Sequence, residues 1–404
     1  MSNSPSPQYT SRLVNRIAPS GIRRFFDLLA SMEGVISLGV GEPDYVTPWS
    51  IRETAITSLE KGYTMYTSNS GMPELRQALS RYLLDKYGLS YNPDTEILIT
   101  VGVSEGMDLA SRAILDLGDE VIIPDPCYVA YPANVTLAGG VPVMVPTSCE
   151  NNFELDIRNI ETRITPKTKA IFFGSPSNPT GTVTTRESLL EIAGLARKNN
   201  LIVISDEIYS KLVYNVEHTC VPTLPGMKER TILLNGFSKA YAMTGWRIGY
   251  AAGPKEIIAA MTKIHQYTIM CAPIMSQIAA IEALKSGDSS AAEMVEDYNR
   301  RRLMMVNGLN EIGLICHEPK GAFYAFPSIV STGFNSEDFS ERLLFEEKVA
   351  CVPGTAFGQC GEGFVRCCYA TSMANIEEAL NRIRRFVLRH TEKPAKRKAH
   401  PVKK

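Results

Sequence analysis

The sequence lacks the long apolar stretches that direct a protein into or through a membrane. Its first twenty residues are polar, and no run of eighteen apolar residues occurs anywhere among the 404 residues. A secretory signal peptide and a transmembrane helix both need such a stretch. The sequence therefore predicts an uncleaved cytoplasmic protein without a membrane partner.

Paired cysteines are missing as well. The nine cysteines are scattered, with none of the CxxC spacing that is typical of a zinc site. Cys367 and Cys368 are adjacent, but neighbouring residues of a strand point to opposite faces, which argues against their chelating one ion. We expect mostly reduced thiols in the core and no metal site.

An excess of one charge is absent too, with 42 basic and 43 acidic residues. Residues 391–404 hold six of the basic residues and one acidic residue. A basic tail can be an address or a nucleic-acid contact, but a short Pro- and Lys-rich end is more often a solvated, disordered terminus. We predict the second and expect no nucleic-acid partner.

What the sequence does contain is a series of short apolar runs. Several are rich in Ile and Val without polar alternation, which is typical of strands buried on both faces of a parallel sheet, and helical patterns lie between some of them. The predicted fold class is α/β, with a large domain built on a mostly parallel seven-stranded sheet flanked by helices. The seven runs cover residues 97–101, 120–123, 141–145, 170–173, 201–205, 231–234 and 247–252.

The pattern changes after Ser286. A charged amphipathic helix at 291–309 is followed by a hairpin-like region at 321–327, and a helical stripe from Ile376 to Val387 would cover a small sheet near 349–352 and 364–369. These elements predict a smaller α+β domain. The predicted organisation is a flexible N-terminus at 1–12, a segment joining the small domain at 13–49, the large domain at 50–285, the small domain at 286–390 and the tail at 391–404.

Lys239 follows the predicted strand at 231–234. Ligands of open α/β sheets bind outside the carboxyl ends of the strands, so this lysine would stand at the mouth of a site. A lysine held as an imine with an aldehyde cofactor needs no further activation as a nucleophile. For a lone lysine, a surface position is the commoner alternative, so its neighbours must decide.

Two more predicted strands end in polar side chains. Asp206 and Tyr209 follow the run at 201–205, and Asn178 lies in a turn-rich segment after 170–173. A carboxylate here can hold a protonated pyridine nitrogen, while the tyrosine and the amide can donate to a phenolate oxygen of the same ring. A helix cap and a tight turn are equally good interpretations of these residues taken singly.

Small residues at 102–106, including Ser104, follow the run at 97–101 and precede a helical pattern. Free amides and the helix dipole at such a place favour an anion such as a phosphate. Loops of this kind are common, so this signal is weak on its own.

Four motifs in order carry a specific resemblance. With Asn178-Pro179-Thr180-Gly181, Asp206-x-x-Tyr209, Ser238-Lys239 and Gly245-Trp246-Arg247-x-Gly249, the chain resembles class I/II aminotransferases of the aspartate aminotransferase superfamily, which are pyridoxal-phosphate enzymes of fold type I. The resemblance covers about residues 13–388. It includes Gly39 to Asp44, Tyr66 with Gly71 to Arg76, Gly321 to Tyr324, and Val352 to Gly354 with Arg366.

The resemblance implies pyridoxal 5′-phosphate as the cofactor. It assigns Lys239 as the lysine that binds the cofactor as an imine and then moves a proton, Asp206 to the pyridine nitrogen, and Asn178 and Tyr209 to the phenolate oxygen. A homodimer with active sites shared across the interface is also implied. The implied phosphate contacts are Val103, Ser104, Ser238, Arg247 and, from the neighbouring subunit, Tyr66.

The resemblance also implies a substrate site. Arg366 matches the arginine that takes the substrate α-carboxylate, with Gly41 and Asn178 beside it, and a planar guanidinium can grip two oxygens. An arginine within a strand can instead form a surface ion pair. Tyr128 matches the aromatic residue that stacks on the cofactor ring, although an aromatic near a strand end is often plain core.

The implied reaction is ping-pong transamination between an amino acid and a 2-oxo acid. Gln266 stands where aspartate-specific relatives have an arginine for the distal carboxylate, and the lysine of other branches is absent at Ser104. The segments around Pro19 to Arg23 and His265 look closest to prokaryotic aspartate, aromatic or N-acetyl-diaminopimelate aminotransferases. We therefore expect a moderately broad enzyme with glutamate/2-oxoglutarate as one partner.

Rival classes stay open. The same fold supports C–S β-lyases and aminocyclopropane-carboxylate synthesis from S-adenosylmethionine. A non-catalytic cofactor-sensing module ranks last, because such relatives carry an N-terminal DNA-binding domain and only 38 residues precede Gly39 here.

Overall fold

The computed structural model describes residues 9–17 and 32–391. The predicted motif at 19–23, residues 1–8 of the predicted flexible N-terminus, and residues 392–404 of the predicted tail lie outside the described residues. Among the described residues, no helix is both long enough and apolar enough to cross a membrane.

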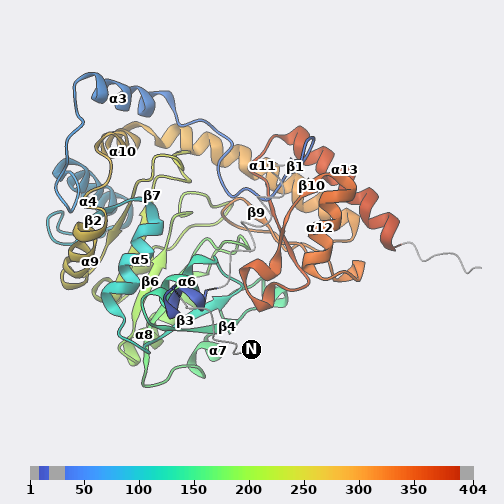
Figure 1. The fold of residues 1–404 in the computed structure, drawn as a ribbon, viewed down its shortest axis with the longest axis horizontal. Coiled ribbons are helices and arrows are strands. Elements are labelled where there is room, and N and C mark those ends of the chain that lie inside the picture. Colours follow the sequence, from blue (N-terminus) through green and yellow to red (C-terminus); the bar gives the residue numbers. More distant parts are fainter. Residues whose placement is uncertain (1–8, 18–31, 392–404) are drawn as a thin grey trace, which may run out of the picture.

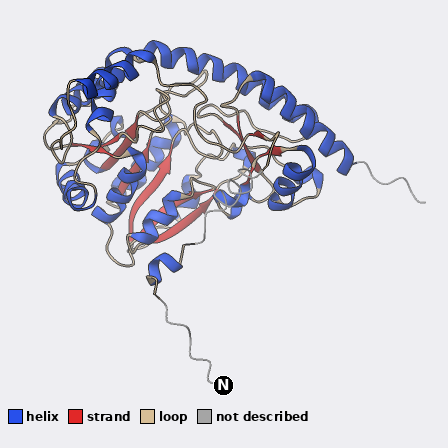
Figure 2. Ribbon diagram, turned by 45° about the horizontal axis from the view of Figure 1, so that its top comes forward, coloured by secondary structure: helices blue, strands red, loops and turns tan. Residues whose placement is uncertain are grey.

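A seven-stranded sheet runs through the larger part of the molecule (Figures 1 and 2). Its strand order is β2-β8-β7-β6-β5-β3-β4, and all pairings are parallel except the two that β8 makes. The prediction of a mostly parallel seven-stranded sheet is thus confirmed. The strands are β2 (Ile97–Thr100), β3 (Glu120–Asp125), β4 (Val141–Pro146), β5 (Thr168–Gly174), β6 (Ile202–Asp206), β7 (Thr231–Gly236) and β8 (Gly249–Ala252).

Helices cover both faces of this sheet. Alternate residues of β5 show the division: Phe172 packs into the core cluster that contains α5 and α6, while Ile171 and Phe173 pack into the cluster that contains α7 and α8. Because successive strand residues point to opposite faces, a strand covered on both sides must be apolar throughout. The helices of this part are α3 (Trp49–Glu60), α4 (Pro73–Tyr87), α5 (Gly102–Ile114), α6 (Ala130–Leu137), α7 (Ile157–Glu161), α8 (Arg186–Lys198), α9 (Lys255–Thr268) and α10 (Ile274–Ser286).

The carboxyl ends of the central strands meet at one edge of the sheet. Gly174 at the end of β5 is in register with Asp206 at the end of β6, and Asp206 with Leu234 of β7. Strand β8 runs the opposite way, so its first residue, Gly249, pairs with Gly236 at the end of β7. The loop before β8 therefore reaches the same edge as the loops that follow the parallel strands.

The C-terminal part contains α11 (Asp288–Ile312), α12 (Ser336–Glu347) and α13 (Met373–Thr391). The predicted hairpin at 321–327 is wrong: this segment contributes one strand, β9 (Tyr324–Ala325), which pairs with β12 (Val365–Cys368) rather than with itself. β12 also pairs with β11 (Val352–Pro353). The division into domains at the boundaries given above stays a prediction.

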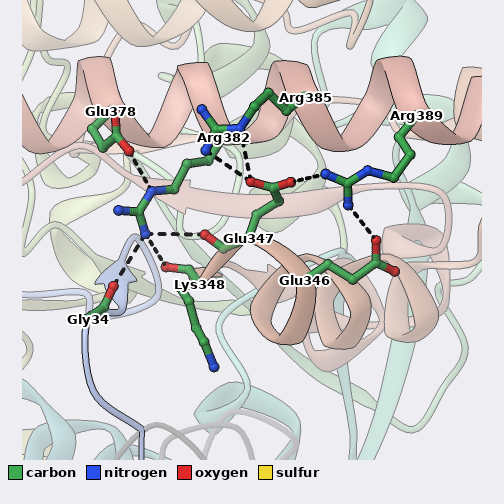
Figure 3. Close-up of polar contacts among 8 residues, drawn as sticks. All are labelled: Gly34, Glu346, Glu347, Lys348, Glu378, Arg382, Arg385 and Arg389. Atoms are coloured by element: carbon green, nitrogen blue, oxygen red, sulfur yellow. Dashed lines mark hydrogen bonds and ion pairs between the residues drawn. The ribbon is translucent and has the colours of Figure 1, made fainter.

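The N-terminal chain also enters this part of the molecule. After the short helix α1 (Arg12–Asn15), β1 (Ile36–Ser37) pairs in parallel with β10 (Val349–Ala350). Figure 3 shows how α13 secures this junction: Arg382 donates to the carbonyls of Gly34, Glu347 and Lys348. Charge-assisted bonds to carbonyls at a helix end satisfy acceptors that have no partner within the helix.

The same network holds α12 against α13. The buried Glu347 carboxylate accepts from Arg389 at 2.5 Å and from Arg385 at 3.1 Å (Figure 3). A buried carboxylate is stable only where it is paired, so these arginines keep the end of α12 in place.

All nine cysteines are free. Cys367 and Cys368 are both buried, and among the described residues no group of three or more His, Cys, Asp or Glu side chains could hold a metal ion.

Candidate active site

A cavity of about 470 Å³ opens at the carboxyl edge of the large sheet. The loops after β5, β6 and β7, the first turn of α5 and the segment after β1 contribute to its wall, and β9 and β12 close it from the other side. All of the predicted site residues except Tyr66 line this cavity: Gly41, Val103, Ser104, Tyr128, Asn178, Asp206, Tyr209, Ser238, Lys239, Arg247 and Arg366. Their individual roles stay predictions.

Lys239 lies in the loop after β7 and faces the cavity. Its Nζ donates to the carbonyl oxygen of Gly41 at 2.6 Å and lies near the faces of the Tyr209 and Phe323 rings. Burial lowers the pKa of Lys239 to about 8, because the charged form loses hydration. A substantial fraction of the amine is then neutral near pH 8 and can act as a nucleophile.

Asp206 ends β6 and is only 4 % exposed. One carboxylate oxygen accepts from the hydroxyl of Tyr131 at 2.9 Å, and the other accepts from the amide of Ile208 at 3.2 Å. Burial nevertheless raises the pKa of Asp206 to about 6. The carboxylate has one oxygen held by a phenol and faces a cavity, which is an arrangement suited to receiving a cationic hydrogen-bond donor.

Arg366, in β12, is 3 % exposed, and among the described residues its hydrogen-bond partners include no carboxylate. It donates to the Asn178 side-chain oxygen at 2.9 Å and to the Gly39 carbonyl at 2.7 Å. Its Nε is buried and has no hydrogen-bond partner within the described part of the chain. A buried guanidinium with uncharged partners and an unused donor attracts an anionic ligand, since an uncompensated buried charge is costly.

Two tyrosines stand beside this arginine. The hydroxyls of Tyr209 and Tyr324 are 2.6 Å apart, and the Tyr324 ring faces the Arg366 guanidinium at 4.5 Å. Gly41 packs against the same ring: a Cβ at Gly41 would lie 2.6 Å from the Tyr324 hydroxyl, so a larger residue would have to displace that hydroxyl.

Another part of the cavity wall can serve as a cradle for an anion. The amides in the first turn of α5 have no partner within the helix, and Val103 and Ser104 of that turn line the cavity together with Ser238. The Arg247 guanidinium lies against the start of the helix: a Cβ at Gly102 would be only 2.7 Å from its Nη2. Helix dipole, free amides, hydroxyls and guanidinium together favour a doubly charged anion such as a phosphate.

The sequence did not single out two of the groups that shape this site. Tyr131 and Tyr324 were not predicted as site residues, although Tyr324 belongs to one of the quoted motifs. Tyr131 lies three residues, or about one helical turn, after Tyr128. This spacing was the only local feature of the sequence that could have indicated Tyr131 as a site residue. Tyr66 is 79 % exposed and does not line the cavity of its own chain.

Comparison with known proteins gives the following. The model of a family described as aminotransferase class I and II matches residues 33–383. A putative aminotransferase, YugH of Bacillus subtilis, is 57% identical over 383 residues, covering 95% of this chain and 99% of the relative. An aspartate aminotransferase of Pyrococcus abyssi is 47% identical, covering 92% and 96%. The crystal structure of an aromatic aminotransferase from Pyrococcus horikoshii superposes with a TM-score of 0.87 at 45% identity, covering 90% and 99%.

Proposed function

The chain belongs to the class I and II aminotransferases, and from this premise we propose that it moves an amino group from an L-amino acid to a 2-oxo acid with pyridoxal 5′-phosphate as cofactor. The observation that carries the proposal is the set of groups that line one cavity. It combines the anion cradle, the Asp206 carboxylate, the Lys239 amine and the Arg366 guanidinium.

The residues present fit this cofactor. The first turn of α5, Ser238 and Arg247 would hold the phosphate, and Asp206 would hold the protonated ring nitrogen. Tyr209 and Asn178 would donate to the phenolate oxygen, and Tyr128 would stack on the ring. When bound, the cofactor supplies an electron-accepting ring that stabilises negative charge on the substrate Cα.

The residues of this chain carry the remaining steps. Arg366 binds the substrate α-carboxylate with two donors and so orients the Cα–H bond toward the ring. The neutral amine of Lys239 takes the proton from Cα and later returns it at a different atom. The carbonyl of Gly41 accepts from the free Lys239 amine and so holds that amine within the cavity.

For the substrate side chain we propose moderately broad use, with glutamate/2-oxoglutarate as one partner. Among the described residues, the cations that line the cavity are Lys239, Arg247 and Arg366, and each has a role above. Gln266 lies exposed on α9. Relatives named for aspartate and for aromatic amino acids are similarly close, at 47% and 45% identity, which supports a broad rather than a narrow choice. We propose the cytoplasm as the location.

An absorbance-monitored screen of amino acids on the purified holoenzyme tests the function. We expect glutamate, and at least one of aspartate, alanine or an aromatic amino acid, to change the cofactor spectrum, and a 2-oxo acid to restore it. Recovery on adding the 2-oxo acid is the mark of a ping-pong transfer. Release of pyruvate and a thiol from cystathionine, without such recovery, would instead establish the C–S lyase. No response to any donor would contradict both.

We also propose a homodimer whose two active sites each use Tyr66 of the partner subunit. The segment before Tyr66 exposes several large apolar side chains, as expected of a surface that is covered by another chain. They are Trp49, Ile56, Leu59, Tyr63 and Met65 on α3 and the loop that follows it.

A hybrid of two variants tests the shared site. Tyr66→Ala and Lys239→Ala homodimers should each be impaired, the first by weaker phosphate binding. A hybrid dimer of the two variants, made by co-expression, contains one site with neither substitution. Each hybrid dimer should therefore have about half of the activity of a wild-type dimer. The measurements are the mass in solution and the activity of the separated hybrid. A monomer, or a hybrid no more active than its parents, contradicts the proposal.

A further inference from the structure

A buried imidazole contacts the first turn of α5. His265, in the last turn of α9, is 0 % exposed, and its Nδ1 lies 2.6 Å from Oε1 of Glu105 in the first turn of α5. The two helices pack along each other. The pair therefore joins them at the end of α5 that faces the anion cradle.

Glu105 is an unfavourable neighbour for a bound anion. It directly follows Ser104, which lines the cavity, at the helix end where free amides attract negative charge. An unrestrained carboxylate at this place would compete with a phosphate for those amides and would repel it. In the structure the Glu105 carboxylate is engaged elsewhere, because Oε2 accepts from the amide of Val101 at 2.6 Å and Oε1 meets His265.

Within residues 9–17 and 32–391, the imidazole has no other polar contact that would explain its presence in the core. Its Nε2 is buried and has no hydrogen-bond partner among the described residues. An apolar side chain would fill a helix-packing position without this unsatisfied group, which costs stability. The contact with Glu105 is therefore the property that distinguishes a histidine here from an apolar residue.

We propose that His265 is a positioning residue for the anion cradle. Its Nδ1–H holds the Glu105 carboxylate on the Val101 side, so that the amides of Val103 and Ser104 stay available for the cofactor phosphate. This inference rests on the proposed function, because it concerns the site in which that cofactor is held.

Equilibrium binding of pyridoxal 5′-phosphate to the apoenzyme tests the inference. His265→Ala should weaken binding about tenfold, since a hydrogen bond to a charged group is lost and the carboxylate is freed. His265→Asn should bind within about twofold of wild type, because its amide nitrogen occupies the Nδ1 position and still donates. His265→Gln, whose amide reaches the Nε2 position instead, is the second disruptive variant.

The double variant His265→Ala/Glu105→Gln is the decisive control. It keeps the packing defect but removes the charge, so it should regain most of the lost affinity. Inorganic phosphate serves as a competitor of the cofactor. The affinity of His265→Ala for phosphate should fall by the same factor as its affinity for the cofactor, because both ligands use the cradle.

Three results would overturn the inference: equal affinities of the single and double variants, a His265→Asn variant as weak as His265→Ala, or unchanged competition by phosphate. Each would mean that the imidazole only packs between α5 and α9. Failure of the wild-type apoenzyme to bind the cofactor would instead refute the proposed function, so the two failures are distinguishable.

Discussion

Replacing Lys239 with alanine is expected to lower kcat by at least about 10³-fold, in the upper half of the range for the loss of a positioned proton carrier. The amine of Lys239 lies beside the carbonyl of Gly41, and burial lowers its pKa to about 8. Lys239 is the only lysine among the described residues that lines the cavity, so no other lysine can replace it. Borohydride reduction of the wild-type holoenzyme, followed by mass spectrometry, should locate the cofactor on the peptide that contains Lys239.

The variant offers its own control. Small primary amines added to Lys239→Ala should restore part of the turnover, because they supply a neutral amine to a cavity that has room for one. The apoenzyme should unfold at close to the wild-type temperature. Full activity without added amine, or cofactor that remains covalently attached after reduction, would refute the assignment of Lys239.

Asp206→Asn is expected to lower kcat by about 10²–10³-fold, the usual cost of losing one preorganised electrostatic partner. The carboxylate would keep the ring nitrogen of the bound cofactor protonated, and an amide cannot do so. The shape of the site should persist, since Tyr131 and the amide of Ile208 can still bond to the new side chain. The measurement is kcat together with cofactor affinity; a variant with wild-type kcat contradicts the role.

The same substitution should stabilise the apoenzyme. Burial raises the folded-state pKa of Asp206 from an ordinary value of 3.8 to about 6. The folded apoenzyme thus binds this proton more tightly than the unfolded chain does, so stability is lost as pH rises from 3.8 through 6. The loss is complete near neutral pH and amounts to at most ~3 kcal/mol.

Thermal unfolding of the two apoenzymes at about pH 5 and pH 8 measures this effect. The advantage of Asp206→Asn should be larger at pH 8, because an amide has no charge to bury. A variant apoenzyme less stable than wild type at pH 8 would show that the Asp206 carboxylate does not destabilise the folded apoenzyme. Together with the kcat result, the stability measurement separates a chemical defect from a folding defect.

Much of the site was predictable because it is local in the chain. Asp206 and Lys239 each follow a short apolar run within a few residues, and Asn178 follows another. A parallel sheet brings the carboxyl ends of such runs to one edge by its geometry alone. The strand pattern therefore predicted that these side chains lie close together, and the structure confirms that they line one cavity.

Other features depend on pairings that no local pattern contains. Arg247 precedes its strand, and it reaches the cavity because β8 is the reversed strand of the sheet. The segment at 321–327 looked like a hairpin, yet its strand pairs with β12, more than forty residues away. Tyr131 reaches Asp206 across 75 residues of the sequence, and Tyr324 reaches Tyr209 across 115.

The sequence by itself identified three site residues and the family, because side-chain chemistry and its spacing from a strand can be seen in the chain. The three residues are Lys239, Asp206 and Asn178. The tertiary structure alone decided how these groups are tuned. The pKa of Lys239 falls and that of Asp206 rises because of the protein packed around them, and the Glu105 carboxylate is held by a histidine 160 residues away. Burial and long-range hydrogen bonds are properties of the packed chain, so they exist only once it has folded.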